Sequence, residues 1–149
     1  MRRTAVIFGG LALVLCAMLW NIARKERLLA EGRRVLLELA PRDPRSLMQG
    51  DYMRLDYTLA QQPRQGWPAD GNLVLTQAQD DVARFVRLHA GGPLQPGEFL
   101  LRYRIRDGRL RLGAESFFFQ EGHAARYARA RHGELRVAPS GDSLLVGLR

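Results

Sequence analysis

The carboxylates of this chain are the residues that could perform acid–base catalysis, because that chemistry needs titratable groups held beside the reacting atoms. Their spacing fixes no common geometry, and each has an ordinary structural use, since an aspartate can hold a turn or pair with a nearby arginine. We therefore interpret them as structural and assign no catalytic residue. A hydrolase built from these carboxylates and Tyr52 stays the alternative. The carboxylates are Asp43, Asp51, Asp56 and Glu115, with Arg45 and Arg54 as candidate partners.

A second group consists of five arginines around Asp107-Gly108, a dipeptide typical of a two-residue β-hairpin turn. Apolar residues alternate with these arginines, so all five guanidinium groups are expected on one face of the hairpin. Facing like charges destabilise a ladder slightly, so something anionic should lie against them. The candidates are acidic side chains of the same domain, lipid headgroups or an acidic partner protein. The five are Arg102, Arg104, Arg106, Arg109 and Arg111, with Arg104 expected opposite Arg111 and Arg106 opposite Arg109.

Other kinds of functional site have no signature in the sequence. His89, His123 and His132 are scattered, and no Cys-x-x-Cys or His-x-x-x-His spacing predicts a metal site. There is no Gly-rich phosphate loop and no Gly-x-Ser-x-Gly turn, so we expect no cofactor. The net charge of +8 rests on arginine, since Lys25 is the only lysine, and this bias is typical of GC-rich coding sequences. The arginine strands carry no interleaved aromatic stacking surface, and we expect no nucleic-acid partner.

The most distinctive pattern is the octet GDYMRLDY, residues 50–57. Gly50 and Asp51 predict a turn, because glycine accepts backbone angles that other side chains resist. A strand follows, and alternation divides its side chains between two faces. The octet is therefore predicted to be mainly architectural. The buried face should carry Met53, Leu55, Tyr57 and Leu59, and the other face Tyr52, Arg54, Asp56 and Thr58.

The octet fits the pattern Gly-Asp-Tyr-x-x-Leu-x-Tyr without a departure, and the chain therefore resembles the bacterial GDYXXLXY family. The segments DPRSLMQGDY, ESFFFQEG and HGELRVAPSGDSLLVGL are also similar to family sequence. The resemblance implies a membrane-associated protein and implies no particular enzymatic reaction. Related domains look like companions of multi-pass membrane proteins. We expect a membrane-tethered, non-enzymatic accessory or interaction module, in contact with the lipid bilayer and with a multi-pass membrane protein; the oligomeric state stays open.

Ser46 invites comparison with signal-peptidase-like domains, which use a Ser/Lys dyad on a membrane-anchored β scaffold. In that pattern the serine lies further before the glycine, where this chain has Arg42. No lysine follows Lys25, and an arginine cannot take the proton of a serine because its guanidinium stays protonated. The sequence argues against the dyad. The alternative hydrolase would therefore use the motif carboxylates on such a scaffold.

Residues 4–23 contain no charged side chain and, at about 1.5 Å per residue, are long enough to cross a bilayer as a helix. Trp20 suits the membrane interface. Residues 19–23 are a poor signal-peptide cleavage site, and Leu15 before Cys16 argues against a lipoprotein signal. We predict an uncleaved, single-pass signal anchor in the bacterial inner membrane. Its short N-terminal tail favours a periplasmic C-terminal domain, whereas the basic residues after the segment favour the opposite orientation.

The remaining pattern predicts a transmembrane helix followed by a mostly antiparallel β (α+β) domain with one or two short helices. We place the anchor and juxtamembrane helix in residues 1–31, ended by a left-handed Gly32, and the β-rich domain in residues 32–149. A helix from residue 78 is the alternative to a strand over 82–88. The expected strands are 35–39, 73–76, 82–88, 99–106, 109–113, a buried 117–119, 134–137 and 144–148, and 121–131 is expected to hold a short helix.

Overall fold

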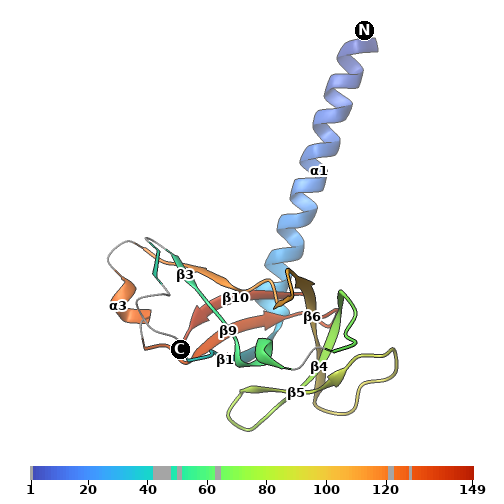
Figure 1. Cartoon of the computed structure of the whole chain (residues 1–149). Coiled ribbons are helices and arrows are strands. Elements are labelled where there is room, and N and C mark those ends of the chain that lie inside the picture. The colour runs from blue at the N-terminus through green and yellow to red at the C-terminus, as the bar shows by residue number, and fades with distance from the viewer. Residues whose placement is uncertain (1, 42–47, 50–51, 63–64, 121–122, 128) are drawn as a thin grey trace.

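The structure, a computed structural model, describes residues 2–41, 48–49, 52–62, 65–120, 123–127 and 129–149. A single long helix, α1 (Arg2–Glu31), projects from a mostly antiparallel β domain and carries the N-terminus at its far end (Figure 1). One helix of the described chain, Val6–Glu31, is long and apolar enough to cross a membrane. The fold class predicted from the sequence is confirmed.

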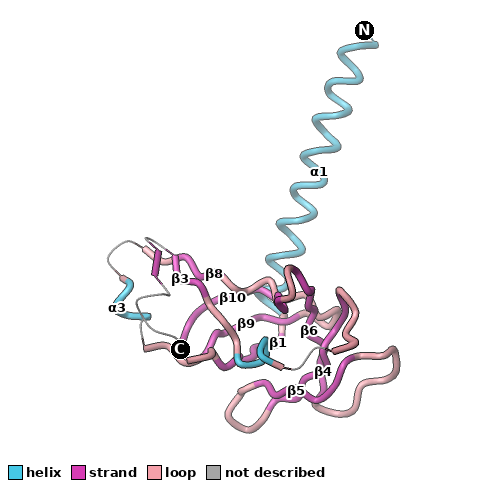
Figure 2. Tube along the Cα trace, in the orientation of Figure 1, coloured by secondary structure: helices cyan, strands magenta, loops and turns pink. Residues whose placement is uncertain are grey.

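The strands that the structure describes form three antiparallel sheets (Figure 2). The first has the order β1 (Arg33–Glu38), β9 (His132–Val137), β10 (Ser143–Leu148). The second has the order β2 (Met48–Gln49), β3 (Tyr52–Arg54), β8 (Ser116–Phe118). The third has the order β5 (Ala83–Leu88), β4 (Asp70–Gln77), β6 (Glu98–Arg106), β7 (Arg109–Arg111). An isolated bridge between Leu36 and Val82 joins the first sheet to the third.

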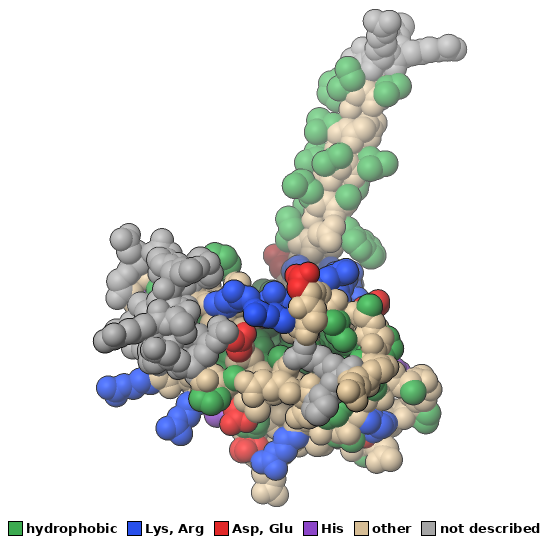
Figure 3. All heavy atoms as spheres, viewed as in Figure 1, with side chains coloured by type: hydrophobic (Ala, Val, Ile, Leu, Met, Phe, Trp, Pro, Cys, Tyr) green, Lys and Arg blue, Asp and Glu red, His purple; other side chains and the backbone are tan. Residues whose placement is uncertain are grey.

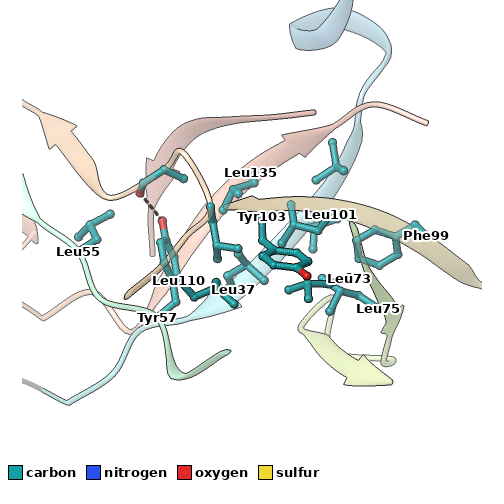
Figure 4. Close-up of a cluster of buried hydrophobic side chains, with 14 of the residues drawn as sticks. Leu37, Leu55, Tyr57, Leu73, Leu75, Phe99, Leu101, Tyr103, Leu110 and Leu135 are labelled. Atoms are coloured by element: carbon teal, nitrogen blue, oxygen red, sulfur yellow. Dashed lines mark hydrogen bonds between the residues drawn. The ribbon is translucent and has the colours of Figure 1, made fainter. Parts of the chain in front are cut away.

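The core lies where the inner faces of these sheets meet (Figure 4). Alternation along the strands selects its members, because every second side chain of a strand points to the same face. In β6, for example, Leu101 and Tyr103 are 1% and 2% exposed, whereas the arginines between and beside them are exposed. The other contributors include Val35, Leu37, Leu55, Tyr57, Leu73, Leu75, Leu110 and Leu135.

The hairpins predicted from local pattern are present. β4 pairs with β5, so the helix from residue 78 is not formed, and β9 pairs with β10. The pairing of β6 with β7 also has the predicted register, with Arg104 opposite Arg111 and Arg106 opposite Arg109. Short turns bring these strands together, and the residues of a turn are local, so the pairings could be predicted from the sequence.

The strand of the motif is shorter than expected. The motif strand β3 ends at Arg54, and Leu59 lies in a 3₁₀ turn, η1 (Thr58–Gln61), rather than on a continued strand. The chain turns there because only an isolated bridge, Leu39 to Tyr57, continues the pairing. Within the region 121–131, the described residues form a short helix, α3 (Ala124–Tyr127), as expected.

Two further predictions are wrong, one about the burial of a strand and one about the backbone conformation of a glycine. The strand at residues 117–119 was expected to be buried, but Phe118 is 74% exposed. β8 is an edge strand whose alternation places Phe117 against the core and Phe118 on the outer face. Gly32 was expected to be left-handed, and it is not among the glycines with positive φ. A glycine suits this position because a Cβ there would collide with the Leu28 carbonyl oxygen.

Candidate functional site

A groove of about 950 Å³ lies between the last turns of α1 and the outer face of β6 and β7. The turn between β9 and β10 closes one side of it. Lys and Arg side chains gather beside the foot of α1, where the helix meets the domain (Figure 3). The helix contributes Trp20, Asn21, Arg24, Lys25, Arg27 and Leu28; the hairpin contributes Arg102, Arg104, Arg106 and Arg111; the turn contributes Asp142.

The local conformation of the hairpin explains why the arginines reach the groove. Asp107 and Gly108 have φ angles of 50° and 66°, which is the left-handed pair required by a tight two-residue turn. This turn keeps β6 and β7 in register, so the residues that alternate with the core side chains all point outward. The same alternation that buries Tyr103 and Leu110 therefore exposes a set of guanidinium groups.

The charge of the groove is strongly positive, since seven basic and two acidic side chains line it. Arg102 is neutralised by Asp142, with Nη1 2.9 Å from Oδ1, and Arg24 pairs with the other carboxylate oxygen. Within the described residues, no ion pair is made by Arg104, Arg106 or Arg111. The same holds, in that part of the chain, for Lys25 and Arg27.

Asp142 joins the three parts of the site, because it contacts α1 through Arg24 and β6 through Arg102 while belonging to the β9–β10 turn. The Ser140 hydroxyl donates to it at 3.1 Å. Burial acts to raise the pKa of the Asp142 carboxyl, but this hydrogen bond and the charges of Arg102 and Arg24 outweigh burial. The pKa of Asp142 therefore lies below its ordinary value, and the carboxylate is charged at neutral pH.

The end of α1 is packed onto the domain. Leu28 is 8% exposed, and the Arg136 guanidinium donates to the Gly32 carbonyl oxygen at 3.0 Å. The helix continues into β1 with a single intervening residue, Gly32. These contacts and the Asp142 pairs fix the direction in which the helix leaves the domain, and with it the width of the groove.

A family model described as GDYXXLXY protein matches residues 14–148, which is nearly the whole chain. The chain belongs to the GDYXXLXY family. Searches of curated proteins and of solved structures found no match to it.

Met53, Leu55 and Tyr57 of the GDYXXLXY motif lie in the core, Arg54 is exposed, and none of the motif residues that the structure describes lines the groove. Leu55 and Tyr57 are each 1% exposed, as the alternation predicted, and the Tyr57 hydroxyl donates to the Ala114 carbonyl oxygen at 2.7 Å (Figure 4). Burial, and to a smaller degree the charge of Glu115, raise the pKa of Tyr57 above its ordinary value. Tyr52 belongs to β3, opposite Gln49 and Phe118. Gly50 and Asp51 lie outside the described residues.

The structure describes only some of the candidate acid–base residues. Glu115 accepts hydrogen bonds from the backbone N–H groups of Leu112 and Gly113, so its carboxylate holds the bend after β7. With Asp56, Arg109 and Arg111 it borders a smaller hollow of about 210 Å³. Asp43, Arg45 and Ser46 lie outside the described residues. Among the residues that the structure describes, no three His, Cys, Asp or Glu side chains are grouped as metal ligands.

Sequence reasoning found the arginines of the groove but missed its second wall and its organising acid. The basic residues after the apolar segment were read only as flanking charges of the anchor. The sequence pattern does not single out Asp142, because its partner Arg24 lies 118 positions earlier in the chain. No local signal connects two residues at such a separation.

Proposed function

We propose that this chain is a single-pass, membrane-tethered, non-enzymatic accessory module of the bacterial inner membrane, with its β domain on the periplasmic side. The hairpin arginines, Arg102 to Arg111, lie against the anionic surface of the bilayer in this proposal. The observation that carries it is the groove, in which the hairpin and the end of α1 are opposite walls. The helix Val6–Glu31, which is long and apolar enough to cross a membrane, supports the association with a membrane.

In this proposal, the length of the helix sets the position of the groove relative to the bilayer. If residues 4–23 cross the hydrocarbon, then residues 24–28 lie within about 8 Å of its edge, at about 1.5 Å per residue. That distance is close to the thickness of one headgroup layer, roughly 5–8 Å. Trp20 and Arg24 line the same groove as Arg104 and Arg111, so the hairpin arginines share this depth.

The charges of the face suit this position. Each basic residue near an anionic bilayer surface contributes about 1 kcal/mol of attraction. A surface anion would also relieve the repulsion between Arg104 and Arg111, which are directly opposite in the ladder. The acidic side chains that the sequence left as an alternative reach only Arg102 within the described part of the hairpin.

Hydrogen exchange of the full chain in nanodiscs tests the proposal. We expect the amides of residues 104–113 to exchange more slowly in anionic than in zwitterionic nanodiscs at low salt. The difference should shrink at 1 M salt, where the screening length falls to about 3 Å. The Arg104→Gln/Arg111→Gln double variant should lose most of the difference.

Arg84→Gln is the matched control, because Arg84 lies on β5, at the edge of the same sheet opposite to β7. It should leave the exchange of residues 104–113 unchanged. Equal exchange of the unmutated chain in both lipids would contradict the proposal. If the double variant then lost a membrane protein that co-purifies with the unmutated chain, the face would belong to an acidic protein partner instead.

A further inference from the structure

We propose that the groove beside α1 is a binding site for the phosphate group of a single anionic phospholipid, whose acyl chains run along the apolar surface of the helix. This inference rests on the proposed function and adds a defined ligand to it. A diffuse electrostatic attraction needs only positive charge on one face. A site needs charges that converge, an acidic element that positions them and a path by which the lipid enters.

The charges converge from two sides. Arg104, Arg106 and Arg111 reach the groove from the hairpin, and Lys25 and Arg27 reach it from the helix. None of the five has an ion-pair partner within the described residues. A guanidinium offers a planar pair of N–H donors that matches two oxygens of a phosphate, and an ammonium adds a compact third donor.

Asp142 joins the two walls of the groove without neutralising these five charges. It holds Arg24 on the helix and Arg102 on β6, and these pairs keep the two walls at a fixed separation. The other five cations remain for a ligand. The groove therefore carries its own structural ion pairs and, beside them, a surplus of positive charge.

The entry to the groove favours a lipid over a soluble anion. Trp20 lines the groove and is 74% exposed, and Leu19 beside it in sequence is 64% exposed. Apolar side chains cover the helix from there toward the N-terminus (Figure 3). A molecule with a phosphate at one end and apolar chains at the other matches a basic groove that is followed by an apolar helix surface. A free phosphate would use only the basic part.

The fluorescence of Trp20 can report on lipid in the groove once the other of the two tryptophans of the chain is replaced. The second, Trp67, stacks on Phe85, makes an edge contact with Tyr103, and is not a groove residue. In a Trp67→Phe background, the full chain would be reconstituted in zwitterionic nanodiscs that contain increasing fractions of phosphatidylglycerol with brominated acyl chains. Brominated phosphatidylcholine would be the reference lipid, since bromine quenches tryptophan fluorescence on contact.

We expect saturable quenching of Trp20 at low fractions of the anionic lipid, and only gradual quenching by the zwitterionic one. Arg104→Gln/Arg111→Gln should raise the half-saturating fraction at least tenfold, since each basic contact with an anionic lipid corresponds to about a fivefold change. Arg104→Lys/Arg111→Lys should retain most of the preference because it keeps the charges. Circular dichroism of the variants would establish that the fold is intact.

Arg109→Gln separates the site from diffuse charge. Arg109 lies on the same hairpin, opposite Arg106, but it does not line the groove. We expect it to change the half-saturating fraction less than twofold. A change of about fivefold, the amount expected for each groove arginine, would overturn the site and leave the proposed function standing. Equal quenching by both lipids would overturn the site as well, and the hydrogen-exchange test would decide the proposed function separately.

Inorganic phosphate distinguishes the two sources of the anion. At matched ionic strength it should not displace the anionic lipid from the groove, because it lacks the acyl chains. Displacement by millimolar phosphate would assign the groove to a soluble anion and overturn the proposal of a lipid.

Discussion

Tyr57 shows how a single residue of the motif is used in this fold. Its ring fills part of the core, and its hydroxyl donates to a backbone carbonyl that would otherwise be buried without a partner. Gly133 leaves room for the ring, since a Cβ there would approach the Tyr57 hydroxyl oxygen to 3.0 Å. The last residue of the octet therefore joins β9 to the bend after β7. Its hydroxyl makes a structural hydrogen bond.

Substitutions at Leu55 and Tyr57 should lower the free energy of unfolding. Leu55→Ala removes a fully buried side chain and should cost roughly 2–5 kcal/mol. Tyr57→Phe keeps the ring but leaves the Ala114 carbonyl without its donor, at a cost of about 1–3 kcal/mol. Leu94→Ala makes the same chemical change as Leu55→Ala at a loop position that is 38% exposed, and it should cost under about 1 kcal/mol. Denaturation of the detergent-solubilised chain measures all three, and unchanged stability of both core variants would mean that the motif serves something other than folding.

At the scale of elements, the sequence predicted the parts whose determinants are local. The β6–β7 hairpin follows from Asp107-Gly108 and from a strict alternation, and both are visible within a dozen residues. Pairings between distant segments were not predictable, such as β1 with β9 and β3 with β8. They depend on which inner faces meet in the core, and a sequence pattern does not specify that. For the same reason, the sequence predicted only one wall of the groove. That wall is the β6–β7 hairpin, whereas the contact with the end of α1 joins distant segments.

The facing arginines of the hairpin should cost stability when no anion covers them. Arg104→Gln/Arg111→Gln removes a directly opposed pair of like charges and should raise the free energy of unfolding by about 0.2–1 kcal/mol in neutral detergent at low salt. Arg102→Gln is the contrasting variant. It loses the pair with Asp142 and should change stability in the opposite direction. Destabilisation by the double variant would show that Arg104 and Arg111 have favourable partners within the protein.

For the molecule as a whole, the junction between helix and domain decides what the domain can reach. A flexible linker would let the hairpin point in any direction, whereas the contacts of Leu28, Gly32 and Arg136 allow one direction. Arg24–Asp142 is the one ion pair described between α1 and the domain, and Arg102 of β6 shares its carboxylate. The position of the groove relative to α1 is therefore a property of the fold.

Asp142→Asn should loosen this junction while the β domain stays folded. The native Cys16 on α1, which is the only cysteine of the chain, and a cysteine introduced by Arg84→Cys on β5 provide two positions for spin labels. We expect the distance distribution between the labels to broaden in Asp142→Asn, because both arginines lose their shared carboxylate. Glu98→Gln is the control, since it breaks the Arg87–Glu98 pair between β5 and β6 and should leave the distribution unchanged.

The same measurement has a predictable pH dependence. The pKa of Asp142 is lower in the folded chain than its unfolded value of about 4, so its contribution is complete above that value. As the pH falls below about 4, the carboxylate takes up a proton and the unmutated chain should come to resemble Asp142→Asn. The variant has no carboxylate at this position, so its distribution should change less over the same range. A distribution that broadens equally in both chains would assign the acid effect to other carboxylates and would remove Asp142 as the residue that orients the domain.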